Sequence, residues 1–316
     1  MIIGSSVLSF DELGDISHDI FVYALGFEAR ATSVASRVLA KRGIAIRLPE
    51  KDIFSYRRNK RFAETRKHLI VTDFEKFLGQ DLPTLLEKSA SKSVGIDISS
   101  MDRRTIFALL EGVACRVQSD TRVYVYYSPS AFSPPDWQFP IIERFGPIDK
   151  LHTAFDTDPL KPLLLIVSAG FEYGVAAGLI SQLEPARTYV FWGSGVDSRF
   201  DDAVKKANFN FDFGAYDVRA VEYNILDPAG VYALLEAIVF RLSKRFRVVI
   251  VPMGPKAFVL QAVLVGMAHL GEVAIWRAQQ DRIAPPDAKP IGRCVTATLN
   301  TQGLIEYAKK RYSVTG

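Results

Sequence analysis

The chain has 316 residues, 48% of them hydrophobic and 23% charged, a composition typical of globular proteins that bury a sizeable core. The formal net charge of +4 does not imply nucleic-acid binding, and two distant cysteines argue against a zinc site or a disulfide framework. The N-terminus lacks a basic signal-peptide region and no apolar stretch is long enough to span a bilayer, so we expect a cytoplasmic protein without a membrane partner.

Apolar runs alternate with helical patterns through the first half of the chain. Ile20–Leu25 predicts a buried strand that ends at Gly26, and the apolar spacing that follows predicts a helix ended by Gly43. Further strands are predicted at 44–48, 68–73, 93–100 and 121–128, and helices in the basic stretch before residue 68 and at 74–91 and 101–117. The Pro-rich segment 128–140 is typical of an irregular loop.

The second half repeats the alternation. Asp227 followed by Pro228 is a helix-start pattern, an N-cap with proline at the first helical position. Strands are predicted at 162–170, 187–193, 220–225, 247–254, 272–278 and 294–300. Helices are predicted at 171–183, 199–208, 227–246, 255–270 and 301–312.

This order predicts an α/β protein built from two tandem Rossmann-like parallel-sheet units, 1–150 and 151–316, the second including the C-terminal strand and helix. Continuous apolar strands agree, because parallel sheets are covered on both faces. The halves align in order, which indicates internal duplication; the aligned pairs are Gly26 with Gly170, Val94 with Val248 and Val123 with Val273. The alternative is two unrelated Rossmann-like domains.

Ligands of open parallel sheets bind beyond the carboxyl ends of the strands. Residues at these ends are therefore the candidate ligand-binding residues, and we assign no catalytic residue, metal or cofactor. They are Gly26, Glu28, Arg30, Asp97, Ser99, Arg103, Arg104, Gly170, Glu172, Gly254 and Lys256.

A Gly-Phe-Glu turn follows the first strand of each half. In one interpretation Glu28 and Glu172 lie in the first turn of a helix and stabilise its positive end. In the other, each carboxylate accepts hydrogen bonds from a ribose hydroxyl, a base amine or a protein donor, and excludes phosphate from the turn. Arg30 follows the first turn and is a candidate phosphate contact.

The sharpest signal is the sequence MGPKAF, in which Pro255 suits the first position of a predicted helix and Lys256 follows it. A lysine there opposes the helix dipole, and residues that break a local rule are often functional. With the free backbone N–H groups it predicts a phosphate or carboxylate site. The first half carries Asp102 at the aligned position, followed by Arg103 and Arg104 as alternative cations.

Two further features have open interpretations. Asp97, followed by Ser99 and Ser100, could act as a base or hold a metal, or could cap the next helix through local hydrogen bonds. The basic segment Arg57–Lys67 is either a solvated helix face or a surface for phosphates, including those of nucleic acid.

The turn in VVIVPMGPKAF resembles the GGTK-like motif of the CARF domains of CRISPR-linked sensors. Gly254 and Lys256 match its Gly and Lys, and Pro255 replaces its Thr; the first half departs from it at SSMDRR. Two fused units of this kind resemble the SAVED arrangement of bacterial antiphage proteins. The resemblance implies binding of a cyclic oligonucleotide, and its cleavage in some members.

We therefore expect a nucleotide or another anionic small molecule as ligand, bound between the halves, in an antiphage defence protein. A binding module of this size would act through a partner protein or by self-association. The alternatives are a nucleotide hydrolase of the ring-nuclease type, with Lys256 stabilising phosphate charge and Asp97 or a Glu as base, and a structural subunit whose sites have decayed.

Overall fold

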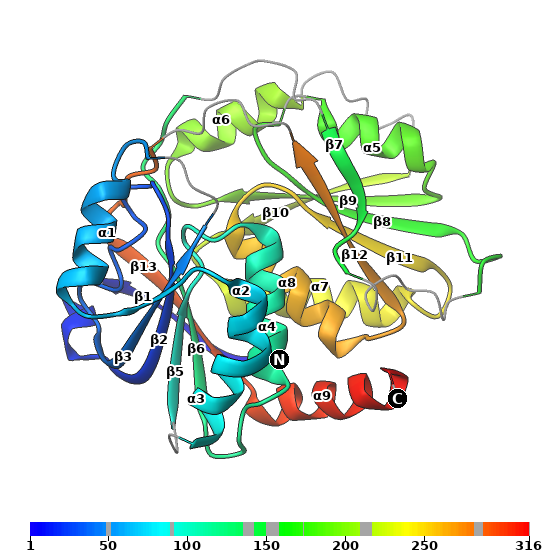
Figure 1. The fold of residues 1–316 in the computed structure, drawn as a ribbon. Helices are drawn as coiled ribbons and strands as arrows, with labels where there is room; N and C mark the ends of the chain where they lie inside the picture. The colour runs from blue at the N-terminus through cyan, green and yellow to red at the C-terminus, as the bar shows by residue number, and fades with distance from the viewer. Residues whose placement is uncertain are drawn as a thin grey trace. The chain divides into compact units, whose positions relative to one another are not determined.

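The computed structural model describes residues 1–48, 52–88, 92–134, 142–149, 158–172, 174–208, 217–280 and 287–315. It is an α/β protein that divides into two compact units (Figure 1). Unit 1 consists of Met1–Ala131 together with Pro286–Gly316, and unit 2 of Phe132–Pro285. The predicted boundary, between 150 and 151, lies outside the described residues.

Within the described residues, unit 1 contains a seven-stranded sheet in the order β1-β13-β6-β5-β2-β3-β4. The central strands pair in parallel, whereas β13 pairs antiparallel with both β1 and β6. The strands are β1 (Ile2–Ser9), β2 (Ser17–Leu25), β3 (Leu39–Arg47), β4 (Leu69–Val71), β5 (Ser93–Asp97), β6 (Arg122–Tyr127) and β13 (Arg293–Leu299).

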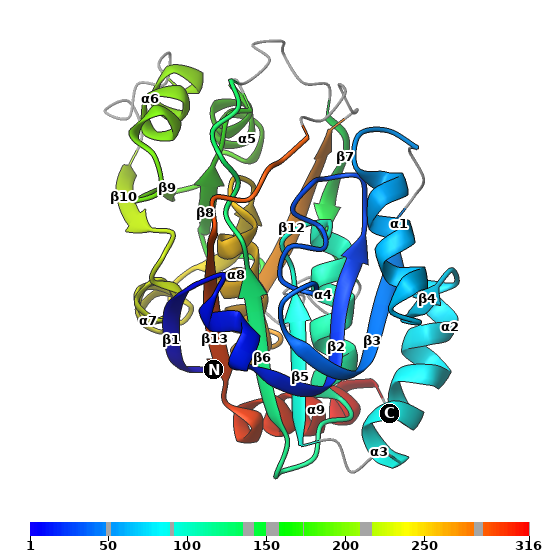
Figure 2. The ribbon, with the colours of Figure 1, turned by 90° about the vertical axis from the view of Figure 1, so that its left-hand side faces the viewer.

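Strand β2 shows why this sheet is covered on both faces. Its residues Ile20 to Leu25 are all buried, so both alternating sets of side chains lie in apolar surroundings. Phe21, Tyr23 and Leu25 pack against Val34 and Val38 of the following segment. The helical elements of unit 1 are η1 (Glu12–Asp15), α1 (Tyr56–Thr65), α2 (Phe74–Lys76), the π-helical η2 (Phe77–Asp81), α3 (Leu82–Lys88), α4 (Arg103–Ala114) and α9 (Thr301–Thr315) (Figure 2).

The helix predicted after Gly26 is wrong. Val34 and Val38 are buried as their spacing predicted, but residues 28–38 form successive turns with irregular hydrogen bonds. Gly43 does not end a helix; it lies within β3, where the His68 ring occupies the space that a Cβ atom would need. Its lack of a side chain serves packing rather than capping.

Within its described residues, unit 2 contains a six-stranded sheet in the order β10-β9-β8-β11-β12-β7. All of its pairs are parallel except β12 with β7. The strands are β7 (Ile142–Pro147), β8 (Leu163–Ala169), β9 (Arg187–Ser194), β10 (Val218–Asn224), β11 (Arg247–Pro252) and β12 (Val273–Gln280). The helices are α5 (Val175–Leu183), α6 (Ser198–Ala207), α7 (Pro228–Leu242) and α8 (Lys256–Ala268).

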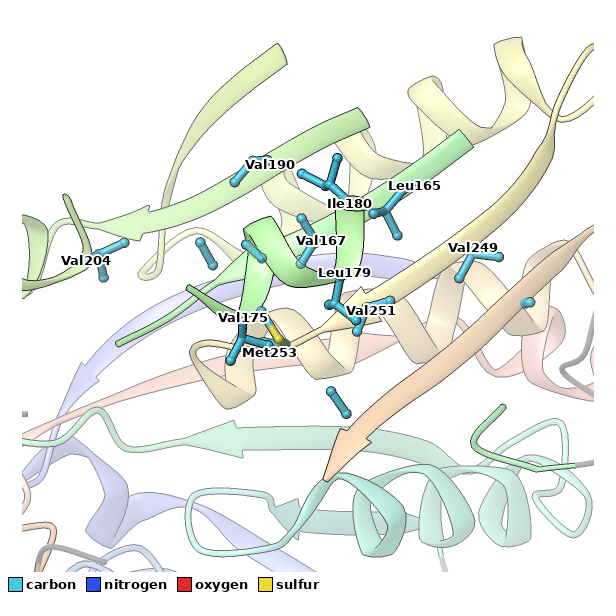
Figure 3. Packing of buried hydrophobic residues seen from close by; sticks show 14 residues of the cluster. Leu165, Val167, Val175, Leu179, Ile180, Val190, Val204, Val249, Val251 and Met253 are labelled. Carbon is cyan, nitrogen blue, oxygen red and sulfur yellow. The ribbon is translucent and has the colours of Figure 1, made fainter. Parts of the chain in front are cut away.

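The two faces of this sheet have separate covers. Figure 3 shows Leu165 and Val167 of β8 with Leu179 and Ile180 of α5 in one cluster of buried side chains. On the other face, Phe258 of α8 contacts two aromatic residues of the sheet, 5.2 and 5.5 Å away between ring centres. Helix α8 is buried along its length from Ala257 to Met267, which explains why Gln261 is the one polar residue in that stretch.

Both sheets share one strand order. The order in unit 1 is β4-β3-β2-β5-β6-β13, and the corresponding order in unit 2 is β10-β9-β8-β11-β12-β7. The last two strands of each order, β6 with β13 and β12 with β7, pair antiparallel. This confirms the prediction of two Rossmann-like units and agrees with the duplication. The C-terminal segment differs from the prediction: β13 joins the first sheet, and α9 packs on α4 through Tyr307 and Arg311, which both donate to Glu111.

No helix in the described part of the chain has the length and hydropathy needed to cross a bilayer.

Candidate functional site

The turns identified in the sequence lie at the switch point of each sheet. The crossover from β2 leads to β3 on one side, and the chain returns through β5 on the other; β8, β9 and β11 repeat this arrangement. A Gly-Phe-Glu turn follows β2 and β8, and the turns leading into α4 and α8 follow β5 and β11. Parallel neighbours end at the same edge, so each unit brings its two turns together.

In unit 1, Asn59 holds the Gly-Phe-Glu turn. This side chain from α1 is fully buried, and its amide donates to the carbonyl oxygens of Gly26 and Glu28 at 2.9 Å each. Its own oxygen accepts from the Thr32 hydroxyl at 3.1 Å. The Phe27 ring packs against Phe54 rather than projecting alone, with 6.1 Å between ring centres.

Unit 2 holds its turn with the same chemistry. The Asn208 amide, immediately after α6, donates to the Gly170 carbonyl at 3.3 Å and to Val204 at 2.8 Å. Phe171 stacks on Phe200 with 5.5 Å between ring centres. Sequence reasoning missed both asparagines; the available signal was an asparagine after the second strand of each half.

Glu28 forms a buried ion pair instead of capping a helix. Its carboxylate accepts from Arg30 Nε at 2.8 Å and from the Ser100 hydroxyl at 2.7 Å, and the Arg30 side chain is only 7% exposed. Arg30 also donates to the Ser128 carbonyl at 3.0 Å and lies over the Tyr127 ring. Burial alone would lower the pKa of Arg30, but Glu28 and Tyr127 raise it above its ordinary value. Arg30 therefore points into unit 1.

Asp97 belongs to a second buried polar group at this edge. Its Oδ1 accepts from the Ser99 backbone N–H at 2.9 Å and from the Ser99 hydroxyl. Ser99 Oγ in turn accepts from the Ser128 N–H at 2.7 Å. All three residues are buried. These are the local hydrogen bonds that one interpretation of Asp97 anticipated, although the residue that caps α4 is Asp102.

The backbone N–H groups at this edge are bonded to the chain itself. The Asp102 carboxylate caps α4 by accepting from the Thr105 N–H at 2.9 Å and its hydroxyl at 3.0 Å. The Asp287 carboxylate accepts from the Ala29 N–H at 2.7 Å. Carboxylates therefore already occupy positions where an anion would bind. Arg104, one of the alternative cations, pairs with Glu75 at 3.2 Å on an exposed surface.

Unit 2 is built differently at the corresponding edge. Gly254 has φ +38°, and a Cβ atom there would lie 2.6 Å from the Ala169 carbonyl oxygen. A Cβ atom on Gly170 would lie 2.9 Å from the Gly254 Cα and would overlap the Glu172 carboxylate. The two turns are therefore in backbone contact, with Glu172 folded back over them. Glu172 also precedes α5, which begins at Val175, so it does not lie in a helical turn as predicted.

Helix α8 begins at Lys256, and its N-cap Pro255 makes no side-chain capping bond. Pro255 therefore precedes the helix, whereas the sequence predicts it at the first helical position. Ser168, at the end of β8, is fully buried, and its hydroxyl has no hydrogen-bond partner among the described residues. That hydroxyl lies 3.0 Å from the position of a Cβ atom on Gly254. Ser168 thus lies beside the Gly254 turn, Lys256 follows that turn in sequence, and Glu172 lies over the neighbouring Gly170.

The eleven predicted residues therefore form separate groups. Gly26, Glu28, Arg30, Asp97 and Ser99 share the carboxyl edge of unit 1, and Arg103 and Arg104 begin α4 beside them. Gly170, Glu172, Gly254 and Lys256 share the carboxyl edge of unit 2. Among the described residues, no three His, Cys, Asp or Glu side chains gather as a metal site.

No protein-family model and no curated protein sequence matches this chain. A Bacillus subtilis tRNA m1A22 methyltransferase, TrmK, is similar at 14% identity over 38% of this chain and half of its own, with a TM-score of 0.23. The NADPH complex of leucoanthocyanidin reductase from Vitis vinifera is similar at 10% identity over 68% of this chain and 81% of its own, with a TM-score of 0.23. The phosphoethanolamine N-methyltransferase 1 of Haemonchus contortus, bound to phosphoethanolamine and S-adenosylhomocysteine, is similar at 9% identity over 91% of this chain and 89% of its own, with a TM-score of 0.23. Such TM-scores carry no argument about function.

Proposed function

We propose that the chain binds a nucleotide at the carboxyl edge of unit 2. The observation that carries the proposal is the difference between two edges with the same topology. In unit 1, Asp102 and Asp287 bond the backbone N–H groups that an anion would use. In unit 2, Lys256 stands at the start of a helix whose N-cap makes no side-chain bond.

The chemistry of this edge suits a ligand with two kinds of polar group. Lys256 and the backbone N–H groups at the start of α8 favour a phosphate. The Glu172 carboxylate repels phosphate and accepts hydrogen bonds, so it favours a ribose hydroxyl or a base amine. A nucleotide offers both groups, separated by a sugar. The buried Ser168 hydroxyl adds a donor or acceptor beside Gly254.

The resemblance of the Gly254-Pro255-Lys256 turn to the CARF motif supports a cyclic oligonucleotide as this ligand, and a sensing role in antiphage defence. On this proposal Lys256 meets phosphate, and signal output requires a partner protein or self-association. A ring-nuclease activity would need a base. Asp97 and Glu28 form hydrogen bonds inside unit 1, so neither is placed to act as a base at the edge of unit 2.

The proposal is tested by calorimetric titration with cyclic di-AMP, cyclic tri-adenylate and cyclic tetra-adenylate. We expect at least one ligand to bind and Lys256→Gln to weaken it about tenfold or more, the effect of losing a charged hydrogen bond. Arg104→Gln, on the exposed surface of unit 1, is the matched control and should leave the Kd unchanged. Absence of binding by every ligand contradicts the proposal, as does equal affinity in Lys256→Gln. Turnover detected by mass spectrometry would favour the hydrolase instead.

A further inference from the structure

Unit 1 contains a cavity at the edge of its sheet opposite to the Gly-Phe-Glu turn. Its volume is about 600 Å³, within the usual range for small-molecule sites. Ser17, Leu39 and Leu69 line it, and they are the first residues of β2, β3 and β4. The cavity therefore lies at the amino ends of these strands and belongs to neither carboxyl edge.

Four basic residues are among those that line this cavity. Lys41 and Arg42 come from β3, and Arg66 and Lys67 follow the end of α1. Lys41 pairs with Asp19 at 2.7 Å. Arg42, Arg66 and Lys67 line the cavity, and none of them forms an ion pair with another residue in the described ranges.

The backbone at the end of α1 fixes the positions of Arg66 and Lys67. Lys67 adopts a left-handed backbone with φ 53°, and the His68 N–H bonds back to the Ala63 carbonyl at 2.9 Å. The chain thereby reverses into β4 and leaves Arg66 and Lys67 beside the cavity. Left-handed backbone is unfavourable for lysine, and such strain collects at functional sites.

The remaining wall is apolar and aromatic. Phe21, Val38 and Ile44 line it, and the His68 ring packs directly on Gly43. His68 Nδ1 shares a hydrogen bond of 2.9 Å with the Tyr23 hydroxyl, which fixes the ring. Burial and the nearby Arg66 lower the pKa of His68, which favours the neutral form of the ring.

Two leucines at the cavity are unusually exposed. Leu39 is 59% and Leu69 48% accessible to solvent, although both lie on the sheet. Together with His68 they offer an apolar surface next to three basic residues that have no ion-pair partner among the described residues. An anion alone would leave that surface exposed, whereas an amphipathic phosphate would cover it.

We propose that this cavity binds a polyphosphorylated small molecule with a planar or apolar body, the chemistry of a nucleoside polyphosphate. Arg42, Arg66 and Lys67 contact the phosphates, and Leu39 and Leu69 contact the body. The site is independent of the function proposed for unit 2, since it uses other residues in another unit. The basic segment Arg57–Lys67 thus has two parts. Its first part is paired, Arg57 with Asp52 and Lys60 with Glu64. Its last two residues, Arg66 and Lys67, line the cavity.

The test is calorimetric titration of the full chain carrying Lys256→Gln, which removes the unit 2 lysine, with ATP and with inorganic tripolyphosphate. Both should bind. Arg42→Gln/Arg66→Gln should weaken both about tenfold or more, because each arginine makes charge-assisted hydrogen bonds. The control variant Arg57→Gln/Lys60→Gln removes two positive charges from α1, the helix that precedes Arg66. It should change the Kd by no more than about twofold, as expected for exposed charges away from the ligand.

A second pair of measurements separates the two parts of the ligand. The double variant Leu39→Ser/Leu69→Ser should raise the Kd of ATP severalfold and leave the Kd of tripolyphosphate unchanged. Only ATP has a nucleoside that can contact the leucines. The proposal is overturned if neither ligand binds, or if Arg57→Gln/Lys60→Gln weakens binding as much as Arg42→Gln/Arg66→Gln. It is also overturned if a single-stranded oligonucleotide binds with that arginine dependence while ATP and tripolyphosphate do not.

Discussion

Replacing Glu28 by alanine removes the partner of a buried cation. The Arg30 side chain is 7% exposed and that of Glu28 16%, so little water can replace the carboxylate. Arg30 would keep its bond to the Ser128 carbonyl, and the Ser100 hydroxyl would lose its acceptor. Breaking a buried ion pair from one side costs about 3–5 kcal/mol, and we expect a loss of this size for Glu28→Ala.

Urea unfolding followed by circular dichroism measures the loss, and amide hydrogen exchange in β2 and β5 assigns it to unit 1. Asp52→Ala breaks the exposed pair with Arg57 and should leave the unfolding midpoint unchanged. Glu28→Ala combined with Arg30→Met should be more stable than Glu28→Ala alone, because no unpaired charge then remains buried. A loss below about 1 kcal/mol for Glu28→Ala would refute a structural role for this carboxylate.

The remaining predictions concern stability. Burial lowers the pKa of His18 from 6.5 to about 4, so as pH falls between these values the unfolded chain gains a proton that the folded chain does not. In urea unfolding, the free energy of unfolding should fall by up to about 3 kcal/mol over that range because of His18, and this fall should be absent in His18→Gln. Equal pH profiles of the unfolding free energy in the two proteins would contradict this. Gly254→Ala should lower the melting temperature, since its Cβ would lie 2.6 Å from a carbonyl oxygen at positive φ, whereas Gly178→Ala in α5 has free space and should not. Asn59→Ala should cost about 2–4 kcal/mol in urea unfolding through two lost buried hydrogen bonds, and an unchanged midpoint would argue against its role in holding the turn.

The strands were predictable because their sequences are continuous apolar runs. Residues 20–25, 164–169 and 248–252 are buried, so both faces of these strands are covered, as in a parallel sheet between two layers. The cap of α7 was predictable for a local reason: Asp227 accepts from the Gly230 N–H at 3.0 Å, and Pro228 stands at the helix start. Both signals depend on residues close together in sequence.

Backbone conformation after Gly26 was not predictable from spacing. Val34 and Val38 face the core, as a helical pattern requires, but turns can bury the same residues. The spacing of apolar residues reports which side chains are buried and leaves the hydrogen-bond pattern open. Likewise Gly43 had two meanings, a helix end or a close contact, and only the position of His68 distinguishes them.

Long-range partners account for the other differences. Arg30 was a candidate phosphate contact because it follows a strand, yet its direction depends on Ser128, far along the chain. The Asp287 carboxylate reaches the Ala29 N–H across most of the sequence. The assignment of β13 to the first sheet depends on antiparallel pairing with β6. None of these contacts leaves a local pattern.

The central claim is that the carboxyl edge of unit 2 binds an anion, whereas at the equivalent edge of unit 1 the carboxylates of Asp102 and Asp287 already accept from backbone N–H groups. Hydrogen exchange by mass spectrometry, with and without cyclic tetra-adenylate or the strongest binder of the titrations, tests it directly. We predict ligand-induced protection of residues 168–172 and 253–258, with no change at 26–30 and 97–102. Protection at 26–30 and 97–102 without protection at 253–258 would contradict the account.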